Sequence, residues 1–264
     1  MSQYFARTEL ASQMAKQLIH PDVLSEGLRS GLFISGQRRT GKTTFLLHDL
    51  VPALEQEGAL VIYVDLWSDT NANPAKLVRE AIRSTLEQLQ TPGSALLGRL
   101  KAVAGAEIGV MGFKLGLKLD KLGEPDGETL AQVIIKLIDQ VKRDVVLIID
   151  EVQQAITTDD GNQLLLALKA ARDAVNPRPG TPGHFLFIGT GSHRAGVNEL
   201  TTRRNQAFNG ATSIAYPVLD ADYVDHVMKR MADAGAKNLP SREIAIEAFR
   251  TLGNRPEELI KALR

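Results

Sequence analysis

Eight consecutive residues have the types and spacing of a loop that binds nucleotide phosphates, G-x-x-x-x-G-K-[S/T]. They are Gly36, Gln37, Arg38, Arg39, Thr40, Gly41, Lys42 and Thr43, and Thr44 follows. Glycines let such a backbone curl until its N–H groups point at phosphate oxygens, and a helix that begins there adds its positive dipole end. The pattern predicts that Lys42 reaches the β- and γ-phosphates and that the Thr43 hydroxyl ligates Mg²⁺.

A second candidate site ends the apolar run 145–149, where Asp150 and Glu151 follow. A strand tip is a rigid place for a carboxylate that positions Mg²⁺, and we expect this role of Asp150. Glu151 lies one residue further on, where it can activate a water for attack on the γ-phosphate. Alone, the pair would also fit a strand end with two solvated carboxylates. Together with the loop at 36–43, it predicts nucleotide hydrolysis.

Other classes of phosphate-loop protein fit these residues poorly. The chain lacks the Asn-Lys-x-Asp guanine reader of GTPases. It also lacks the Leu-Ser-Gly-Gly-Gln signature of transporter-type ATPases, since its only Ser-Gly-Gln, at 35–37, belongs to the loop itself. Small-molecule kinases usually have no Glu directly after the strand Asp, which is a weaker ground for exclusion. We therefore expect ATP or ADP as the ligand, with Mg²⁺.

These motifs need a scaffold, and apolar runs alternate with helical patterns along the chain. Strands are expected at 32–35, 60–65, 145–150, 184–189 and 212–216, and helices at 42–56, 74–89, 128–142 and 162–175. Runs nearly continuous in Val, Ile, Leu and Phe are typical of strands buried on both faces of a parallel sheet. Pro52 is expected to kink or end the first helix. The fold class predicted is α/β, a three-layer P-loop NTPase with a mainly parallel sheet.

Two segments break this alternation. Residues 92–127 hold eight glycines and an alternating apolar run at 113–119. We expect an inserted half-buried strand or hairpin at about 105–120, either an edge decoration of the sheet or a contact with a subunit or partner. Residues 176–183, rich in Pro and Gly, are expected to form a loop. Trp67 is expected to cover the edge of the core, with a partner contact as the alternative.

After Pro217 the strand pattern stops. Residues 220–234, 241–252 and 256–264 have helical patterns, with Asp220 and Ser241 at N-cap positions. The domains expected are a P-loop core at 1–217 and a small helical lid at 218–264. The lid is short and the chain stops within a helix, so we expect either a minimal lid or an effector domain that this sequence leaves out.

The composition of the chain indicates which partners and which cellular compartment to expect. Lys and Arg together number 31, as do Asp and Glu, so the net charge is zero and gives no support for a nucleic-acid partner. The chain contains no cysteine, which excludes disulfides and thiolate metal sites and fits a reducing cytoplasm. No apolar stretch approaches the roughly 18–20 residues of a membrane span. A cytoplasmic protein without a membrane partner is expected.

The two motifs, with their flanks at 33–35 and 148–153, and the helical tail resemble those of the prokaryotic archaeal-type ATPases. This is a branch of the AAA+ superfamily close to the STAND ATPases and to transposition-target ATPases. The resemblance extends from Phe5 to Leu263. The opening at 5–10 is similar to a degraded form of the Arg-Glu-x-Glu-Leu start that packs near the adenine, which implies that Arg7 contacts the base.

The same resemblance implies roles for further residues. A polar residue at the tip of the fourth strand senses the γ-phosphate; Thr190 is the first candidate and Ser192 the second, although both also suit a turn cap. Arg255 in the Gly-Asn-Arg-Pro stretch 253–256 looks like a sensor-2 arginine over the phosphates, or else part of a helix N-terminal turn. An arginine finger is expected after the fourth strand, beside the nucleotide edge of the sheet. Its candidates are Arg194, Arg203 and Arg204, which also suit a solvated basic loop.

The function expected is Mg²⁺-dependent ATP binding and hydrolysis that drives a conformational or assembly switch, with self-association or a protein partner. One alternative is a DNA-handling AAA+ ATPase of the transposition or loader kind. Another is a nucleotide-binding module that does not hydrolyse ATP. A steep salt dependence of DNA binding would favour the first alternative, and ATP turnover would exclude the second.

Overall fold

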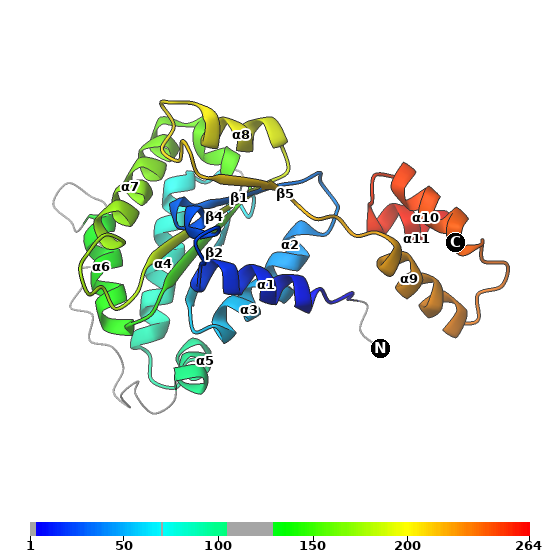
Figure 1. Cartoon of the computed structure of the whole chain (residues 1–264), viewed down its shortest axis with the longest axis horizontal. Helices are drawn as coiled ribbons and strands as arrows, with labels where there is room; N and C mark the ends of the chain where they lie inside the picture. The colour runs from blue at the N-terminus through cyan, green and yellow to red at the C-terminus, as the bar shows by residue number, and fades with distance from the viewer. Residues whose placement is uncertain (1–3, 70, 105–128) are drawn as a thin grey trace.

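The computed structural model describes residues 4–69, 71–104 and 129–264 and contains a five-stranded parallel sheet (Figure 1). The strand order is β2-β3-β4-β1-β5. The strands are β1 (Leu32–Ser35), β2 (Leu60–Asp65), β3 (Val145–Asp150), β4 (Phe185–Gly191) and β5 (Thr212–Ala215). The predicted α/β class with a mainly parallel sheet is confirmed. Only the ends of β4 and β5 differ from the prediction, by one or two residues.

The sheet places the predicted motifs at one edge. β1, β3 and β4 are buried at every position, which explains their almost continuous apolar sequences. β4 lies between β3 and β1 and pairs with both in parallel. The carboxyl ends of these three strands therefore lie side by side. Asp150 ends β3, Thr190 lies near the end of β4, and Gly36 follows β1.

Helices cover both faces of the sheet and make the three layers. One apolar cluster packs α4, α6, α7 and α8 against one face, and a second packs α1 and the helix after the phosphate loop against the other. The first group is α4 (Pro74–Gln90), α5 (Ala95–Ala104), α6 (Leu130–Val141), α7 (Asp159–Val175) and α8 (Arg194–Thr202). The second is α1 (Thr8–Ile19), α2 (Lys42–Phe45), η2 (Leu46–Leu50) and α3 (Val51–Gln56). Two short 3-10 turns, η1 (Glu26–Ser30) and η5 (Val152–Thr157), complete the core.

The helix after the phosphate loop does not end at Pro52. It continues to Gln56 through the π-helical segment η2, in which the Val51 N–H bonds to the Leu46 carbonyl five residues back. A proline ring clashes with the carbonyl four residues before it in a regular α-helix, and a wider turn relieves that clash. Of the two expectations for Pro52, a kink or a helix end, the helix end is therefore wrong, because a π turn accommodates the proline.

No helix or strand was expected at 95–104, which is the described part of the interval after α4. Residues 95–104 form α5, whose Leu96 and Leu100 join the core. The strand or hairpin expected at about 105–120 lies outside the described residues. Residues 176–183 form the expected loop. Among the described helices, three were not expected from the sequence: α1, α5 and α8.

Three helices follow the sheet as predicted: α9 (Ala221–Asp233), α10 (Arg242–Thr251) and α11 (Pro256–Ala262). Figure 1 shows them together at one end of the molecule. They enclose a small apolar cluster around Phe249 and Leu259. Ser241 caps α10 through its side chain. Asp220 stands at the N-cap of α9 but makes no cap bond, because its carboxylate pairs with Arg250 at 2.9 and 2.6 Å.

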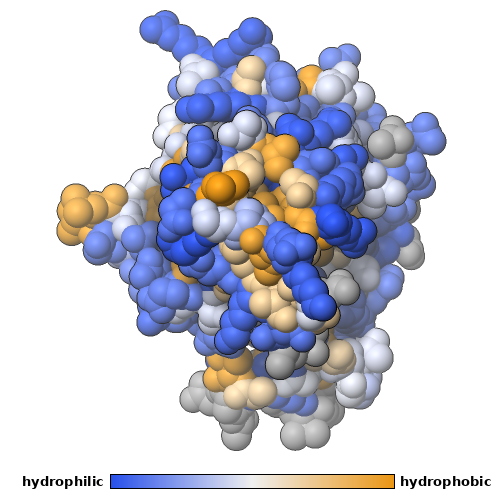
Figure 2. Space-filling model, turned by 90° about the vertical axis from the view of Figure 1, so that its right-hand side faces the viewer, coloured by the Kyte–Doolittle hydropathy of each residue, from blue (hydrophilic) through white to orange (hydrophobic). Residues whose placement is uncertain are grey.

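Figure 2 looks onto the end of the molecule that carries these three helices and shows an apolar area among hydrophilic residues. Two large apolar side chains in this part of the chain are exposed, Ile244 at 60% and Val218 at 41%. No helix among the described residues is long and apolar enough to cross a membrane.

The packing of α6 on the sheet predicts a stability difference between two leucines. Leu137 on α6 is 0% exposed, whereas Leu166 on α7 is 46% exposed. Leu137→Ala should lower the free energy of unfolding by about 2–5 kcal/mol, because it leaves a cavity in the core. Leu166→Ala, the matched control, should change it by less than about 0.5 kcal/mol. Chemical denaturation measures both, and equal costs would contradict this packing.

Candidate functional site

Residues 36–43 follow β1 and lead into the start of α2. Two positions in this loop require glycine. Gly41 adopts a φ of 88°, which favours glycine. A Cβ on Gly36 would lie 2.7 Å from the Tyr216 Cβ, so only glycine fits there. The buried Thr40 hydroxyl donates to the Gln37 carbonyl at 2.8 Å and ties the loop to itself. The curl that a phosphate-binding backbone needs is therefore present.

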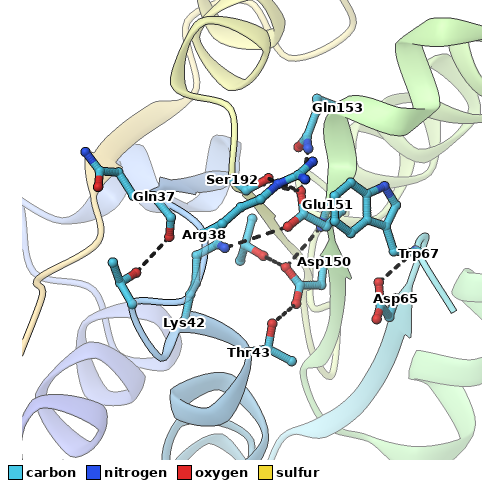
Figure 3. A network of polar contacts seen from close by, with 12 residues as sticks. Gln37, Arg38, Lys42, Thr43, Asp65, Trp67, Asp150, Glu151, Gln153 and Ser192 are labelled. Carbon is cyan, nitrogen blue, oxygen red and sulfur yellow. Dashed lines mark hydrogen bonds and ion pairs between the residues drawn. The ribbon is translucent and has the colours of Figure 1, made fainter. Parts of the chain in front are cut away.

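Asp150 is the centre of a hydroxyl cluster at the carboxyl edge of the sheet. It is 1% exposed. Thr43 Oγ1 donates to Asp150 Oδ2 at 2.6 Å, and Tyr63 Oη donates to the same oxygen at 3.3 Å. Thr190 Oγ1 and the Glu151 N–H donate to Oδ1, the latter at 3.0 Å (Figure 3). The cluster joins the phosphate loop to three neighbouring strands through one carboxylate.

Burial raises the pKa values of two groups beside Asp150. Burial raises the pKa of the Tyr63 hydroxyl above its usual range, and the Asp150 charge adds to this. Tyr63 thus remains a hydroxyl donor to the carboxylate. Burial also raises the pKa of Asp65, the residue paired with Asp150 in the β2–β3 register. Asp65 and Asp150 therefore place two neighbouring carboxyl groups at this edge, and Glu151 follows Asp150 in the chain.

Glu151 follows Asp150 in a left-handed backbone conformation, with φ 55°. Its side chain is buried, and its Oε2 accepts from the Ser192 N–H at 3.1 Å and from Ser192 Oγ at 2.8 Å. The Gln153 amide donates to the same oxygen. Lys42 Nζ lies 3.9 Å from Oε1. The expected base and the expected phosphate-binding lysine are therefore neighbours.

Arg38 extends from the loop across the site (Figure 3). Its guanidinium carbon lies 4.0 Å from the centroid of the Trp67 ring, and its Nε donates to Ser192 Oγ at 3.2 Å. The backbone N–H of Trp67 donates to Asp65 Oδ1 at 2.8 Å and anchors this residue. The expectation that Trp67 simply covers the core edge is wrong, since its ring stacks on an arginine of the loop.

Two cavities meet at the loop. One of about 430 Å³ is lined by Arg38, Arg39, Gly41, Lys42, Thr43, Thr44, Trp67 and Glu151. A second of about 320 Å³ is lined by residues of the N-terminal segment, the helix after the loop and the C-terminal helices, including Arg7, Phe45, Tyr216, Tyr223 and Pro256. Both are bordered by Gly41 and Thr44. The charged and hydroxyl side chains of the first cavity suit phosphates, and we call it the phosphate-side cavity. The aromatic rings of the second suit a base, and we call it the base-side cavity.

Asp49 holds the N-terminal segment beside the second cavity. This carboxylate is 6% exposed and accepts from the Arg7 N–H at 3.0 Å and from the Tyr4 hydroxyl. The Arg7 guanidinium lies over the rings of Phe45 and Tyr216, at 5.6 and 5.5 Å, and donates to Tyr216 Oη at 3.1 Å. Arg7 thus lines this cavity, and its bonds are to protein groups; its contact with a base stays a prediction.

The C-terminal helices approach the loop through one turn. A Cβ on Gly253 would lie 3.3 Å from Gln37 Oε1. Arg39 lies 3.9 Å from Glu257 and 4.0 Å from Glu258 of α11, in exposed pairs that contribute little energy. Arg255 begins α11 and is exposed. The expected sensor-2 residue therefore lies near the loop.

The arginine-finger candidates lie apart from one another. Arg194 begins α8 just after β4, whereas Arg203 and Arg204 follow the other end of that helix, which leads to the start of β5. Arg203 pairs with Glu199 at 2.7 Å. Because β5 starts beside the start of β1, Arg203 and Arg204 lie toward the amino edge of their own sheet. The expectation that they lie beside the nucleotide edge of the same chain is wrong, because α8 carries them away from it.

Several residues that contribute to the site were not predicted from the sequence. Tyr63, Asp49 and Tyr216 touch it, and Gln153 holds Glu151. A signal was present for Asp49, a lone carboxylate in the otherwise apolar stretch 45–54 apart from His48. No local pattern distinguishes Tyr63 or Gln153, since their role depends on which strands become neighbours.

The oxygen donors fit a magnesium ion bound together with nucleotide phosphates. Mg²⁺ commonly takes one or two protein oxygens and fills its other positions with phosphate and water. The Thr43 hydroxyl and the Asp150 carboxylate, 2.6 Å apart beside the phosphate-side cavity, supply such a pair. Among the described residues, no three His, Asp or Glu side chains form a cluster that could hold a metal by themselves.

Comparisons with known proteins bear on the same region. The model of a family described as an ATPase domain predominantly from Archaea matches residues 21–262. No curated protein matches the sequence. Cdc6p from Pyrobaculum aerophilum has a similar fold, with a TM-score of 0.50 and 17% identity over 92% of this chain and 54% of that one. The ORC1 protein of Aeropyrum pernix, solved in complex with DNA, has a TM-score of 0.49 and 15% identity over 88% and 51%. This chain thus spans about half the length of the solved structures that it matches.

The Asp49 contacts predict that this carboxylate orders the base-side cavity. Asp49→Ala leaves two donors without their acceptor, a loss that commonly costs about 1–3 kcal/mol. We expect faster amide exchange at residues 4–10 and weaker nucleotide binding. Glu9→Ala is the control, because Glu9 lies on the exposed face of α1 and accepts a hydrogen bond from Gln13 of the same helix. Hydrogen exchange measured by mass spectrometry checks this, and unchanged exchange in Asp49→Ala would refute the anchor.

Proposed function

The chain belongs to the family of ATPase domains found predominantly in Archaea. We propose that it is an ATP hydrolase and that it couples Mg²⁺-dependent ATP hydrolysis to a conformational or assembly switch. One observation carries the proposal most directly. The loop hydroxyl of Thr43 and the strand-end carboxylate of Asp150 meet at 2.6 Å, with the buried Glu151 directly adjacent. This is the arrangement that joins phosphate binding to metal binding and water activation.

The chain's own groups would divide the work of hydrolysis. Backbone N–H groups of residues 36–43 and the Lys42 ammonium bind and orient the phosphates. Thr43 and Asp150 would hold Mg²⁺, which when bound neutralises charge on the phosphate oxygens. Glu151 would accept a proton at its carboxylate from the attacking water. Thr190, bonded to Asp150, would keep that carboxylate in place.

We propose that α9–α11 act as a lid over the nucleotide. The base-side cavity is lined by the core residues Phe45 and Tyr216 and by Tyr223 and Pro256 of the lid. Phe5 of the N-terminal segment packs edge-on against Tyr223 at 5.7 Å between ring centroids. A base in this cavity would contact both parts at once, so binding favours the arrangement in which they close on it. Arg255 would then approach the phosphates from α11.

The proposal predicts different losses for two variants. Lys42→Ala should abolish measurable ATP binding, because it removes the cation that faces the phosphates. Glu151→Gln should bind ATP near the wild-type affinity and hydrolyse it about 10²–10⁴-fold more slowly, because an amide accepts no proton from water. Calorimetric titration and a phosphate-release assay measure the two effects. Turnover by Glu151→Gln at the wild-type rate would remove Glu151 as the base.

We also propose that a second copy of the chain completes the site with Arg203 or Arg204. Both are exposed and lie away from their own nucleotide edge, so they can act only on a neighbour's site. An arginine supplied in this way can accelerate hydrolysis by roughly 10³–10⁵-fold.

This self-association predicts that ATPase activity per subunit rises with protein concentration. Arg203→Ala or Arg204→Ala should abolish the rise while ATP affinity stays near wild type. Arg242→Ala serves as control, since Arg242 is equally exposed and paired, at 2.7 Å to Asp225. Specific activity that is constant from dilute to concentrated protein, with both variants fully active, would leave a monomeric enzyme.

A further inference from the structure

Arg38 is linked to the candidate base through a single hydroxyl. Its Nε donates to Ser192 Oγ at 3.2 Å, and Ser192 Oγ donates to Glu151 Oε2 at 2.8 Å (Figure 3). A serine hydroxyl has only one proton to give. By accepting from Arg38, Ser192 directs that proton to Glu151. A side chain of the phosphate loop therefore fixes a donor to the carboxylate that is expected to activate water.

Glu151 is restrained in this arrangement. Its Oε2 accepts three hydrogen bonds, from the Ser192 N–H, the Ser192 hydroxyl and the Gln153 amide. The other oxygen, Oε1, faces Lys42 at 3.9 Å. A carboxylate has about four lone-pair sites, so these partners occupy most of its accepting capacity. Release of one of them would free capacity for a water.

Arg38 itself is held by contacts that an anion can replace. Its side chain is exposed, and its contacts are the face of Trp67 and one serine hydroxyl. A guanidinium carries five N–H donors, and the Ser192 bond uses one. The residue borders the phosphate-side cavity together with Lys42 and Thr43. Guanidinium–phosphate bonds are charge-assisted and can be bidentate, which makes phosphate a stronger partner than a hydroxyl.

We propose that Arg38 recognises the third phosphate of the nucleotide, and that in doing so it leaves Trp67 and Ser192 and loosens the restraint on Glu151. This rests on the proposed function, because it requires nucleotide phosphates in the cavity beside the loop. ADP lacks the phosphate nearest Glu151 and leaves Arg38 stacked. Arg38 is then a positioning residue for Glu151 as well as a phosphate ligand. The loop would thereby distinguish the nucleotide before hydrolysis from the one after it.

The chain offers a built-in reporter for this movement. Trp67 is its only tryptophan, so intrinsic fluorescence reports on the ring that Arg38 covers. With Mg²⁺ and a non-hydrolysable ATP analogue, Trp67 emission should change as the guanidinium leaves, whereas saturating ADP should leave it nearly unchanged. In Arg38→Gln the analogue should produce no such change. Arg39→Gln, the neighbouring loop arginine whose side chain faces α11, should retain the response.

The affinity for the ATP analogue tests the same movement of Arg38. It should fall in one variant and rise in another. Arg38→Gln should weaken binding of the ATP analogue roughly tenfold to hundredfold, as expected for loss of a charge-assisted hydrogen bond, and leave ADP binding unchanged. Ser192→Ala should strengthen analogue binding several-fold, because it removes the bond that Arg38 must give up. The double variant should match Arg38→Gln alone, since Ser192 competes only through Arg38.

The outcomes separate this inference from the proposed function. If the wild type binds neither ADP nor the analogue, the nucleotide site itself is wrong. If both bind, but Trp67 responds to them equally and Arg38→Gln weakens both alike or neither, Arg38 does not recognise the third phosphate. A Trp67 response specific to the analogue, lost in Arg38→Gln and kept in Ser192→Ala, supports the proposal.

Discussion

The architecture of the site depends on the buried carboxylate of Asp150. A charge that is 1% exposed is costly unless its oxygens are hydrogen-bonded. Here the donors come from Thr43 in the loop, Tyr63 on β2 and Thr190 on β4. Tyr63 and Thr190 can reach it because the parallel sheet places β2 and β4 on either side of β3. Satisfying one carboxylate therefore fixes the loop, the strand ends and the adjacent Glu151 relative to one another.

The helix after the phosphate loop also contributes to the base-side cavity. Its π-helical turn at Leu46–Leu50 carries His48 and Asp49, which line the base-side cavity. Irregular turns of this kind occur often at functional sites. Asp49 in turn tethers the N-terminal segment, and Phe5 in that segment contacts Tyr223 of α9. Phosphate loop, base cavity and C-terminal helices are thus connected through one short helix.

Much of this site could be predicted because its signals are local. The residues of 36–43 follow one another in sequence, and Asp150 ends a run whose apolar character marks a buried strand. Parallel pairing then requires both at the same edge of the sheet. The positions of α9–α11 could likewise be predicted from helical periodicity and from the cap residue Ser241.

The rest of the site depends on contacts between residues distant in sequence. Nothing near Trp67 indicates that Arg38 stacks on it, and nothing near Ser192 indicates its bonds to Arg38 and Glu151. The places of Arg203 and Arg204 were wrong because α8 was not recognised as a helix, so its length did not enter the prediction. The helix end predicted at Pro52 was wrong for a different reason. A π turn accommodates a proline that would disrupt a regular helix.

The central claim is that Thr43 and Asp150 act together on the metal that accompanies the nucleotide. The most direct measurement is the gain in ATP affinity on adding Mg²⁺, determined by calorimetry for the wild type, Thr43→Ala, Asp150→Asn and the double variant. We predict that each single variant loses most of the gain and that the double variant loses little more, with metal-free ATP binding nearly unchanged throughout. A full Mg²⁺ gain in Asp150→Asn would contradict the claim.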